Sequence, residues 1–149
     1  GLISAFTTPT GGTSDYLPEM LHAAMQKKKY ICFVHKNTKM PFMLMPDAIS
    51  AIYTLMNTSK NRLSSHVYNI TSFNPSPDEF YCLLKKYLPN TRITYCINEQ
   101  KQEMVDSWPS NIDDTLARND WDWSPKYDLD KAFKHYLIPF IKEYYNIKE

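Results

Sequence analysis

The segment Pro9–Tyr16, PTGGTSDY, holds the residues of this chain that are best suited to bind a small polar molecule. Its two adjacent glycines let the backbone approach a ligand closely, and two hydroxyl side chains follow at once. Free amides beside Gly12 and the Thr13 hydroxyl could bind a carboxylate or a substrate hydroxyl. An ordinary flexible turn that ends as the cap of a helix over 18–28 would have the same composition, so both interpretations stay open.

A second candidate segment, Asp106–Asp114, places Trp108 between polar residues. An aromatic wall with polar neighbours suits a small polar substrate. The alternative is a core tryptophan followed by a capped helix with acidic residues in its first turn. Trp121 and Trp123, which lie two positions apart, we interpret as packing against the last helix.

Two pairs have the Tyr-x-x-x-Lys spacing in which a lysine lowers the pKa of a tyrosine for proton abstraction: Tyr81/Lys85 and Tyr127/Lys131. A chain rich in both residue types produces such pairs by chance, so neither is interpreted as catalytic. The histidines show no metal-ligand spacing, and no Ser-His-Asp set can be ordered from the sequence. The sequence therefore offers no catalytic residue of its own.

The composition narrows the class of protein. A length of 149 residues predicts one domain, and 43% hydrophobic with 22% charged residues is typical of a globular protein. A net charge of +1 gives no reason to expect a nucleic acid or an anionic membrane as partner. No apolar run reaches the ~20 residues of a membrane span, and the first residues do not read as a signal peptide. Three scattered cysteines indicate a reduced intracellular protein, and a mitochondrial or a cytoplasmic location both stay open.

The glycines exclude one kind of site. The chain has three, Gly1, Gly11 and Gly12, and none follows. Gly-rich phosphate loops need backbone conformations and close approaches that glycine supplies. If this protein binds a dinucleotide, we expect its pyrophosphate to be held by nothing in this chain.

The hydrophobic pattern predicts a mixed α/β order of elements. We expect helices over 18–28, 47–56, 77–88, 99–106, 110–121 and 128–145, and strands over 30–34, 41–45, 66–71 and 91–97. Asp47 is the expected N-cap of the second helix, Ser76 and Glu79 form a capping box, and Pro139 should kink the last helix. The polar segment between the first two strands is long enough for a hairpin, so we expect these strands to form one. The strand 66–71 is apolar almost throughout and should need cover on both faces, which indicates part of a larger sheet.

Several of these segments together resemble a known family. They are GLIS, TTPTGGTSDY, KMPFMLMPDAI, VYNIT, PSPDEF and above all VDSWPSNIDDTLARNDWDW. In this combination they resemble the C-terminal half of the short-chain-dehydrogenase type of L-threonine 3-dehydrogenase, within the extended short-chain dehydrogenases. The resemblance runs from residue 1 to about residue 138.

The resemblance implies an α/β fold: residues 1–149 would be the C-terminal, substrate-binding portion of a Rossmann-type extended short-chain dehydrogenase. The half with the glycine fingerprint and the catalytic Tyr-x-x-x-Lys would be absent, and the strand 66–71 would join its sheet. The implied reaction of the full-length chain is oxidation of L-threonine to 2-amino-3-ketobutyrate with NAD+, and the full-length protein would be a homodimer. The fragment alone would be inactive.

The resemblance also implies site residues. Gly12, Thr13 and Trp108 would bind the substrate, and Leu2 would meet the nicotinamide end of NAD. Thr10 stands where the family usually has a glycine. No metal is implied.

Two alternatives come from other classes. The first is the substrate half of a nucleotide-sugar epimerase or dehydratase, which would normally present basic side chains to a diphosphate. The three arginines, Arg62, Arg92 and Arg118, lie outside both candidate segments, which counts against it. The second is a non-catalytic binding module. We also expect the isolated chain to self-associate or to be loosely folded, because an absent half would leave apolar surface uncovered.

Overall fold

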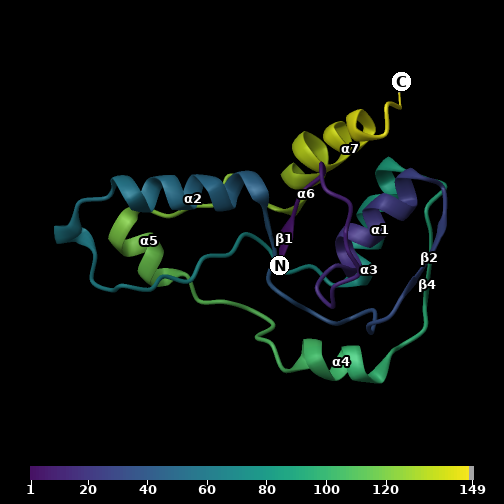
Figure 1. Cartoon of the computed structure of the whole chain (residues 1–149), viewed down its shortest axis with the longest axis horizontal. Helices are drawn as coiled ribbons and strands as arrows, with labels where there is room; N and C mark the ends of the chain where they lie inside the picture. The colour runs from purple at the N-terminus through teal and green to yellow at the C-terminus, as the bar shows by residue number, and fades with distance from the viewer. Residues whose placement is uncertain (148–149) are drawn as a thin grey trace.

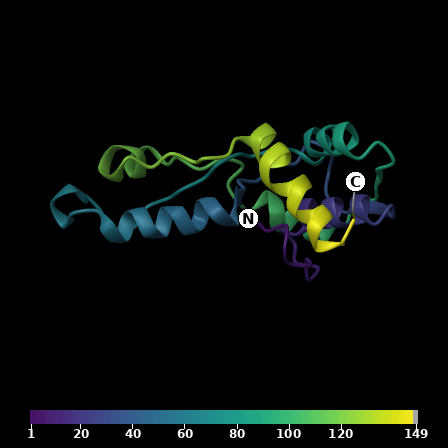
Figure 2. The ribbon, with the colours of Figure 1, turned by 90° about the horizontal axis from the view of Figure 1, so that it is seen from above.

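The computed structural model describes residues 1–147, which form a larger and a smaller lobe (Figures 1 and 2). In chain order the elements are β1 (Leu2–Ile3), α1 (Tyr16–Met25), β2 (Lys29–Cys32), β3 (Met43–Leu44), α2 (Met45–Asn57), η1 (Lys60–Arg62), α3 (Pro77–Tyr87), β4 (Arg92–Tyr95), α4 (Glu99–Asp106), α5 (Thr115–Trp121), α6 (Leu129–Ala132), η2 (Phe133–Leu137) and α7 (Ile138–Tyr144). The predicted α/β class is confirmed.

The described strands form two separate parallel pairs, β1 with β3 and β2 with β4. The expected hairpin between 30–34 and 41–45 is therefore wrong. The intervening chain crosses from one sheet to the other and buries Val34, Met40 and Phe42 in the core, so the two strands end in different sheets. Of the segment 41–45, the two residues Met43 and Leu44 pair as a strand.

The segment 66–71 forms no strand, although its composition predicts one. The Tyr68 hydroxyl donates to Asp120, and the Tyr68 and Ile70 side chains pack on a cluster around Trp121. Within the described residues, β pairing in this region is a single antiparallel bridge between Phe42 and Phe73. Pairing of 66–71 with a sheet outside this chain stays a prediction.

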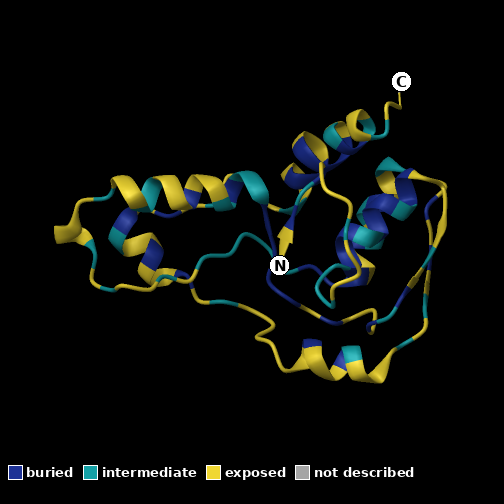
Figure 3. Ribbon diagram, viewed as in Figure 1, coloured by how far each residue is buried: buried dark blue, intermediate teal, exposed yellow. Residues whose placement is uncertain are grey.

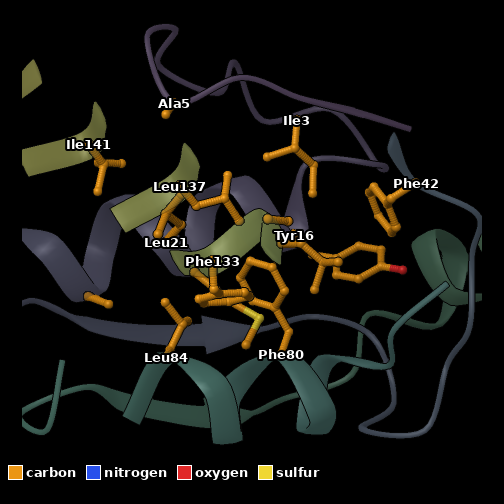
Figure 4. Packing of buried hydrophobic residues seen from close by; sticks show 14 of the residues in the cluster. Ile3, Ala5, Tyr16, Leu21, Phe42, Phe80, Leu84, Phe133, Leu137 and Ile141 are labelled. Carbon is orange, nitrogen blue, oxygen red and sulfur yellow. The ribbon is translucent and has the colours of Figure 1, made fainter. Parts of the chain in front are cut away.

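The larger lobe has a dense apolar core between α1, α3, the first strand and the last helix (Figure 4). Phe80 of α3 meets Phe133 with ring centroids 4.7 Å apart, and Tyr16 of α1 lies edge-on to Phe42 at 5.8 Å. The capping box of α3 is confirmed: the Ser76 hydroxyl accepts from the Glu79 amide, and the Glu79 carboxylate accepts from the Ser76 amide. This core holds β1 and the loop after it in place.

The last helix is interrupted, as its proline predicts. Asp128 caps it by accepting from the Lys131 amide at 2.8 Å. The turn Phe133–Leu137 is a π-helix, and Pro139 follows in the first turn of α7. Since proline has no amide hydrogen to donate, a local change of hydrogen-bond register at this point is expected.

The smaller lobe consists of α2, α5 and the chain between α2 and residue 71 (Figure 1). Trp121 and Trp123 pack here with Ala51 of α2, which corrects the expectation that they pack on the last helix. The helix predicted over 110–121 begins five residues later, at Thr115.

Asp47 is not an N-cap, because α2 begins two residues earlier, at Met45. Its buried carboxylate instead accepts from the Ser72 hydroxyl and from the amides of Lys126 and Tyr127, at 3.1, 3.0 and 3.3 Å. A side chain near the start of α2 thus ties the two lobes together.

Among the described residues, no helix has the length and apolar character needed to span a bilayer. The described residues also contain no group of three or more His, Cys, Asp or Glu side chains that could bind a metal ion.

Candidate functional site

A hollow of about 260 Å³ opens at the carboxyl end of β1, beside the loop that follows this strand. Its lining combines an apolar residue of the strand with hydroxyl and carboxyl groups of the loop: Leu2, Ser4, Thr7, Thr8, Pro9, Thr10, Asp15 and Pro18. Parallel sheets bind ligands beyond the carboxyl ends of their strands. We therefore take this hollow, the β1 hollow, as the candidate site.

The loop above the β1 hollow already contains an anion-binding arrangement. The amides of Thr10 and Gly12 both donate to one carboxylate oxygen of Asp15, at 3.1 and 3.0 Å. The Asp15 amide returns a bond to the Gly12 carbonyl at 2.9 Å, and Gly11 takes a φ of 88°, which favours glycine. The Gly12 amide itself is thus occupied, because Asp15 fills the place of an anion. The expected binding by free amides beside Gly12 and by the Thr13 hydroxyl stays a prediction.

The loop is fastened to the last helix. Phe6 packs on Tyr136 and on Phe140, with ring centroids 6.4 and 5.0 Å apart. The hydroxyls of Thr8 and Tyr144 lie 2.7 Å apart and share a hydrogen bond. The position of the candidate loop therefore depends on residues more than a hundred positions later in the chain.

His22 connects α1 to the residue that follows the last helix, next to the attachment of the loop. Its Nδ1 lies 2.8 Å from the Tyr145 hydroxyl, to which Gln26 donates at 2.7 Å. Burial lowers the pKa of His22, because the charged imidazolium is poorly solvated in this position. The neutral form thus fits the closed packing of α1 against the end of the chain.

The structure places the candidate residues unequally. Leu2 is half exposed in the β1 hollow, whereas Gly12 is exposed and Thr13 half-buried in the loop above it. Trp108 follows α4, is about one-third exposed, and lies outside the lining of the β1 hollow. Its segment reaches β1 through Ile112, which lines a second hollow together with Leu2.

The two Tyr-x-x-x-Lys pairs have ordinary surroundings. The Lys85 ammonium lies 5.2 Å from the centre of the Tyr81 ring, a cation–π contact within α3. Neither pair lines the β1 hollow. Sequence reasoning missed Asp15 and Tyr144; of the two, only Asp15 had a signal, since it directly follows the glycine–hydroxyl run.

NAD fits this chain only in part. The half-exposed Leu2 offers an apolar surface on which a nicotinamide ring could lie. Among the described residues, however, no glycine-rich turn between a strand and a helix could cradle the pyrophosphate. Most of a dinucleotide would have to be held by other residues.

Comparison with known proteins finds relatives along most of this chain. Mitochondrial L-threonine 3-dehydrogenase of Bos taurus is 35% identical to this chain in sequence. The aligned region covers 87% of this chain and 35% of the bovine protein. An uncharacterized epimerase/dehydratase of Staphylococcus haemolyticus is 37% identical over 87% of this chain and 41% of its own. None of the protein-family models searched matches.

Solved structures agree with the sequence relatives. The structure of L-threonine 3-dehydrogenase from Trypanosoma brucei superposes with a TM-score of 0.91 and 34% identity, over 98% of this chain and 45% of that one. The chain thus spans about half or less of the length of the relatives it matches. Over nearly its whole length it is similar to the C-terminal portion of the L-threonine 3-dehydrogenases and to part of the epimerase/dehydratase.

Proposed function

We propose that this chain is the substrate side of an NAD-dependent L-threonine 3-dehydrogenase. The observation that carries the proposal is its similarity over nearly the whole chain to threonine dehydrogenases. In the longer chain, bound NAD+ would take a hydride from the β-carbon of L-threonine and leave 2-amino-3-ketobutyrate. We propose that the longer chain acts inside the cell, in the cytoplasm or in mitochondria, as a homodimer, and that the 149 residues alone are inactive.

The residues of this chain would bind and orient the substrate. The Thr13 hydroxyl and the loop backbone at Gly12 would hydrogen-bond the amino acid, and Trp108 would keep water from the reacting carbon. Leu2 would contact the nicotinamide end of the cofactor. The loop amides that now bind Asp15 provide donors suited to a carboxylate, if the Asp15 side chain turns away.

The epimerase/dehydratase relative makes a nucleotide-sugar enzyme the second candidate. The arginines argue against it, because each is engaged within the chain. Arg118 makes a bidentate pair with Asp114, Arg62 an ion pair with Asp122, and Arg92 donates to a backbone carbonyl. A diphosphate would have to displace these partners.

The test is turnover by the longer chain that contains these residues. We expect NADH formation with L-threonine and none with UDP-glucose; the reverse result would establish the second candidate and overturn the first. Thr13→Ala should raise KM for threonine about five- to tenfold, since a hydrogen bond contributes about 1 kcal/mol. The exposed Ser124→Ala is the matched control and should leave KM unchanged.

A further inference from the structure

The loop that follows β1 forms part of the wall of the β1 hollow, yet its own backbone holds it weakly. The loop is mostly exposed (Figure 3). Within the described residues, positions 6–9 make no backbone–backbone hydrogen bond. Thr7, Thr8 and Pro9 nevertheless line the hollow. A segment of this kind keeps one conformation only if side chains fix it.

The last helix supplies side-chain contacts that fix the loop. Phe6 packs on Tyr136 and on Phe140. Two positions later, the Thr8 hydroxyl lies 2.7 Å from the Tyr144 hydroxyl. Phe6 does not line the hollow, whereas Thr8 does. The bond between the two hydroxyls therefore acts directly on a residue of the wall.

The Tyr144 ring is itself held in place. Its centroid lies 5.7 Å from that of His22 and 4.9 Å from that of Tyr145, and both contacts are edge-on. Such contacts restrict the orientation of an aromatic ring. The Tyr144 hydroxyl is thus presented to Thr8 at a low cost in side-chain entropy.

Tyr144 can influence the hollow only through the loop. Its side chain is 38% exposed and is not part of the lining. Ordering a loop when a ligand binds costs free energy, and a loop that is already ordered avoids this cost. A contact that fixes Thr8 beforehand should therefore strengthen the binding of any ligand that the wall touches.

We propose that Tyr144 is a positioning residue for the β1 hollow. Its hydroxyl holds Thr8 in the wall and thereby sets the affinity of the hollow for a small amino acid. This deepens the proposed function and rests on it for the identity of that amino acid, L-threonine.

The first test is a double-mutant cycle in the longer chain that contains these residues. Tyr144→Phe removes one hydroxyl and keeps the ring, and Thr8→Val removes the other with little change of shape. We expect each to raise KM for L-threonine about three- to fivefold, the effect of losing one hydrogen bond, and to leave kcat nearly unchanged. The double variant should bind no worse than Thr8→Val alone, because Tyr144 acts through Thr8. Additive effects would overturn the proposal, as would an unchanged KM for Tyr144→Phe.

Hydrogen exchange followed by mass spectrometry reports on the loop without any reaction. In the longer chain, we expect the amides of residues 6–12 to exchange about three- to fivefold faster in Tyr144→Phe, with exchange in α3 unchanged. Tyr87→Phe is the matched control. Tyr87 stacks on Phe133, and its hydroxyl makes no hydrogen bond within residues 1–147, so this variant should alter neither loop exchange nor KM. Equal loop exchange in the two tyrosine variants would overturn the proposal.

The two measurements also separate this proposal from the proposed function. Turnover of L-threonine together with unaltered loop exchange in Tyr144→Phe refutes only the role of Tyr144. Faster loop exchange in Tyr144→Phe, when the unsubstituted longer chain does not turn over L-threonine, refutes only the proposed activity. Should Tyr144→Phe not fold, Thr8→Val breaks the same bond from the other side and should speed loop exchange to the same extent.

Discussion

Helices α2 and α3 differ in what surrounds them. Helix α3 buries Phe80 and Leu84 in the main core, and its ends carry charges that suit water and the helix dipole. Helix α2 has an equally regular pattern. One apolar face packs on the cluster around Trp121, whereas the other is exposed to solvent and consists of Ile49, Ile52, Tyr53 and Met56. The comparison teaches that helical spacing identifies an apolar face, whereas the absence of charge on the remaining surface tells whether a further partner is needed.

The largest expected effect compares the buried face of α3 with the open face of α2. Phe80→Ala should lower the free energy of unfolding by about 3–5 kcal/mol, because a core aromatic leaves a cavity. Ile52→Ala should change it by less than about 0.5 kcal/mol in the 149-residue chain. Urea unfolding of both variants measures these free energies. A large decrease for Ile52→Ala would mean that the exposed face of α2 is covered in the isolated chain, for example by self-association.

The second effect concerns the attachment of the α2 lobe. Asp47→Ala removes the buried acceptor of three part-buried hydrogen bonds and leaves their donors without this partner, which should cost about 3 kcal/mol. The exposed Asp130→Ala is the control, with an expected change near zero. Chemical denaturation followed by tryptophan fluorescence suits the measurement because Trp121 and Trp123 lie in this lobe. Equal effects of the two substitutions would contradict the role of Asp47.

A smaller effect on stability is expected from the difference between the N-terminal caps of α3 and α2. Ser76→Ala removes one half of the α3 capping box and should destabilise the chain by about 1 kcal/mol. Helix α2 has Leu44 at the corresponding position, without a side-chain cap bond. Thermal unfolding of Ser76→Ala, with Ser124→Ala as the control, checks the size; no difference between them would mean that packing alone holds the start of α3.

The smallest effect is a dependence on pH in the larger lobe. Because burial lowers the pKa of His22 below its usual 6.5, the unfolded chain binds more protons as the pH falls. The stability from neutral His22 is therefore complete above pH 6.5 and is lost as the pH falls toward the lowered pKa. Melting temperatures of His22→Gln should fall less steeply with decreasing pH than those of the exposed His66→Gln. Parallel curves would refute this.

Local sequence signals identified a large part of the secondary structure. The capping box before Phe80, the proline before Phe140 and the periodicity of α1 act through neighbours within a few residues, so the sequence shows them directly. The glycine–hydroxyl run also marked the loop that borders the β1 hollow. Strand pairing could not be found in this way, since β2 and β4 lie some sixty residues apart.

The same distinction applies to the candidate site. Gly12 and Thr13 stood out by residue type, but the capture of the loop amides by Asp15 depends on the folded turn. The bond between Thr8 and Tyr144 joins positions 136 residues apart. Residue type alone does not bring Trp108 to the β1 hollow, and its role in substrate binding stays a prediction.

By itself the sequence determined the helices with strong caps, the glycine-containing loop before α1 and the lack of a glycine-rich phosphate-binding motif, because these depend on local residue types and conformational preferences. Tertiary structure alone decided which strands pair, that Asp47 joins the two lobes, and which apolar face of α2 is left open. Those features depend on contacts between distant segments, where burial and hydrogen-bond satisfaction over the whole fold outweigh the preferences of any single segment.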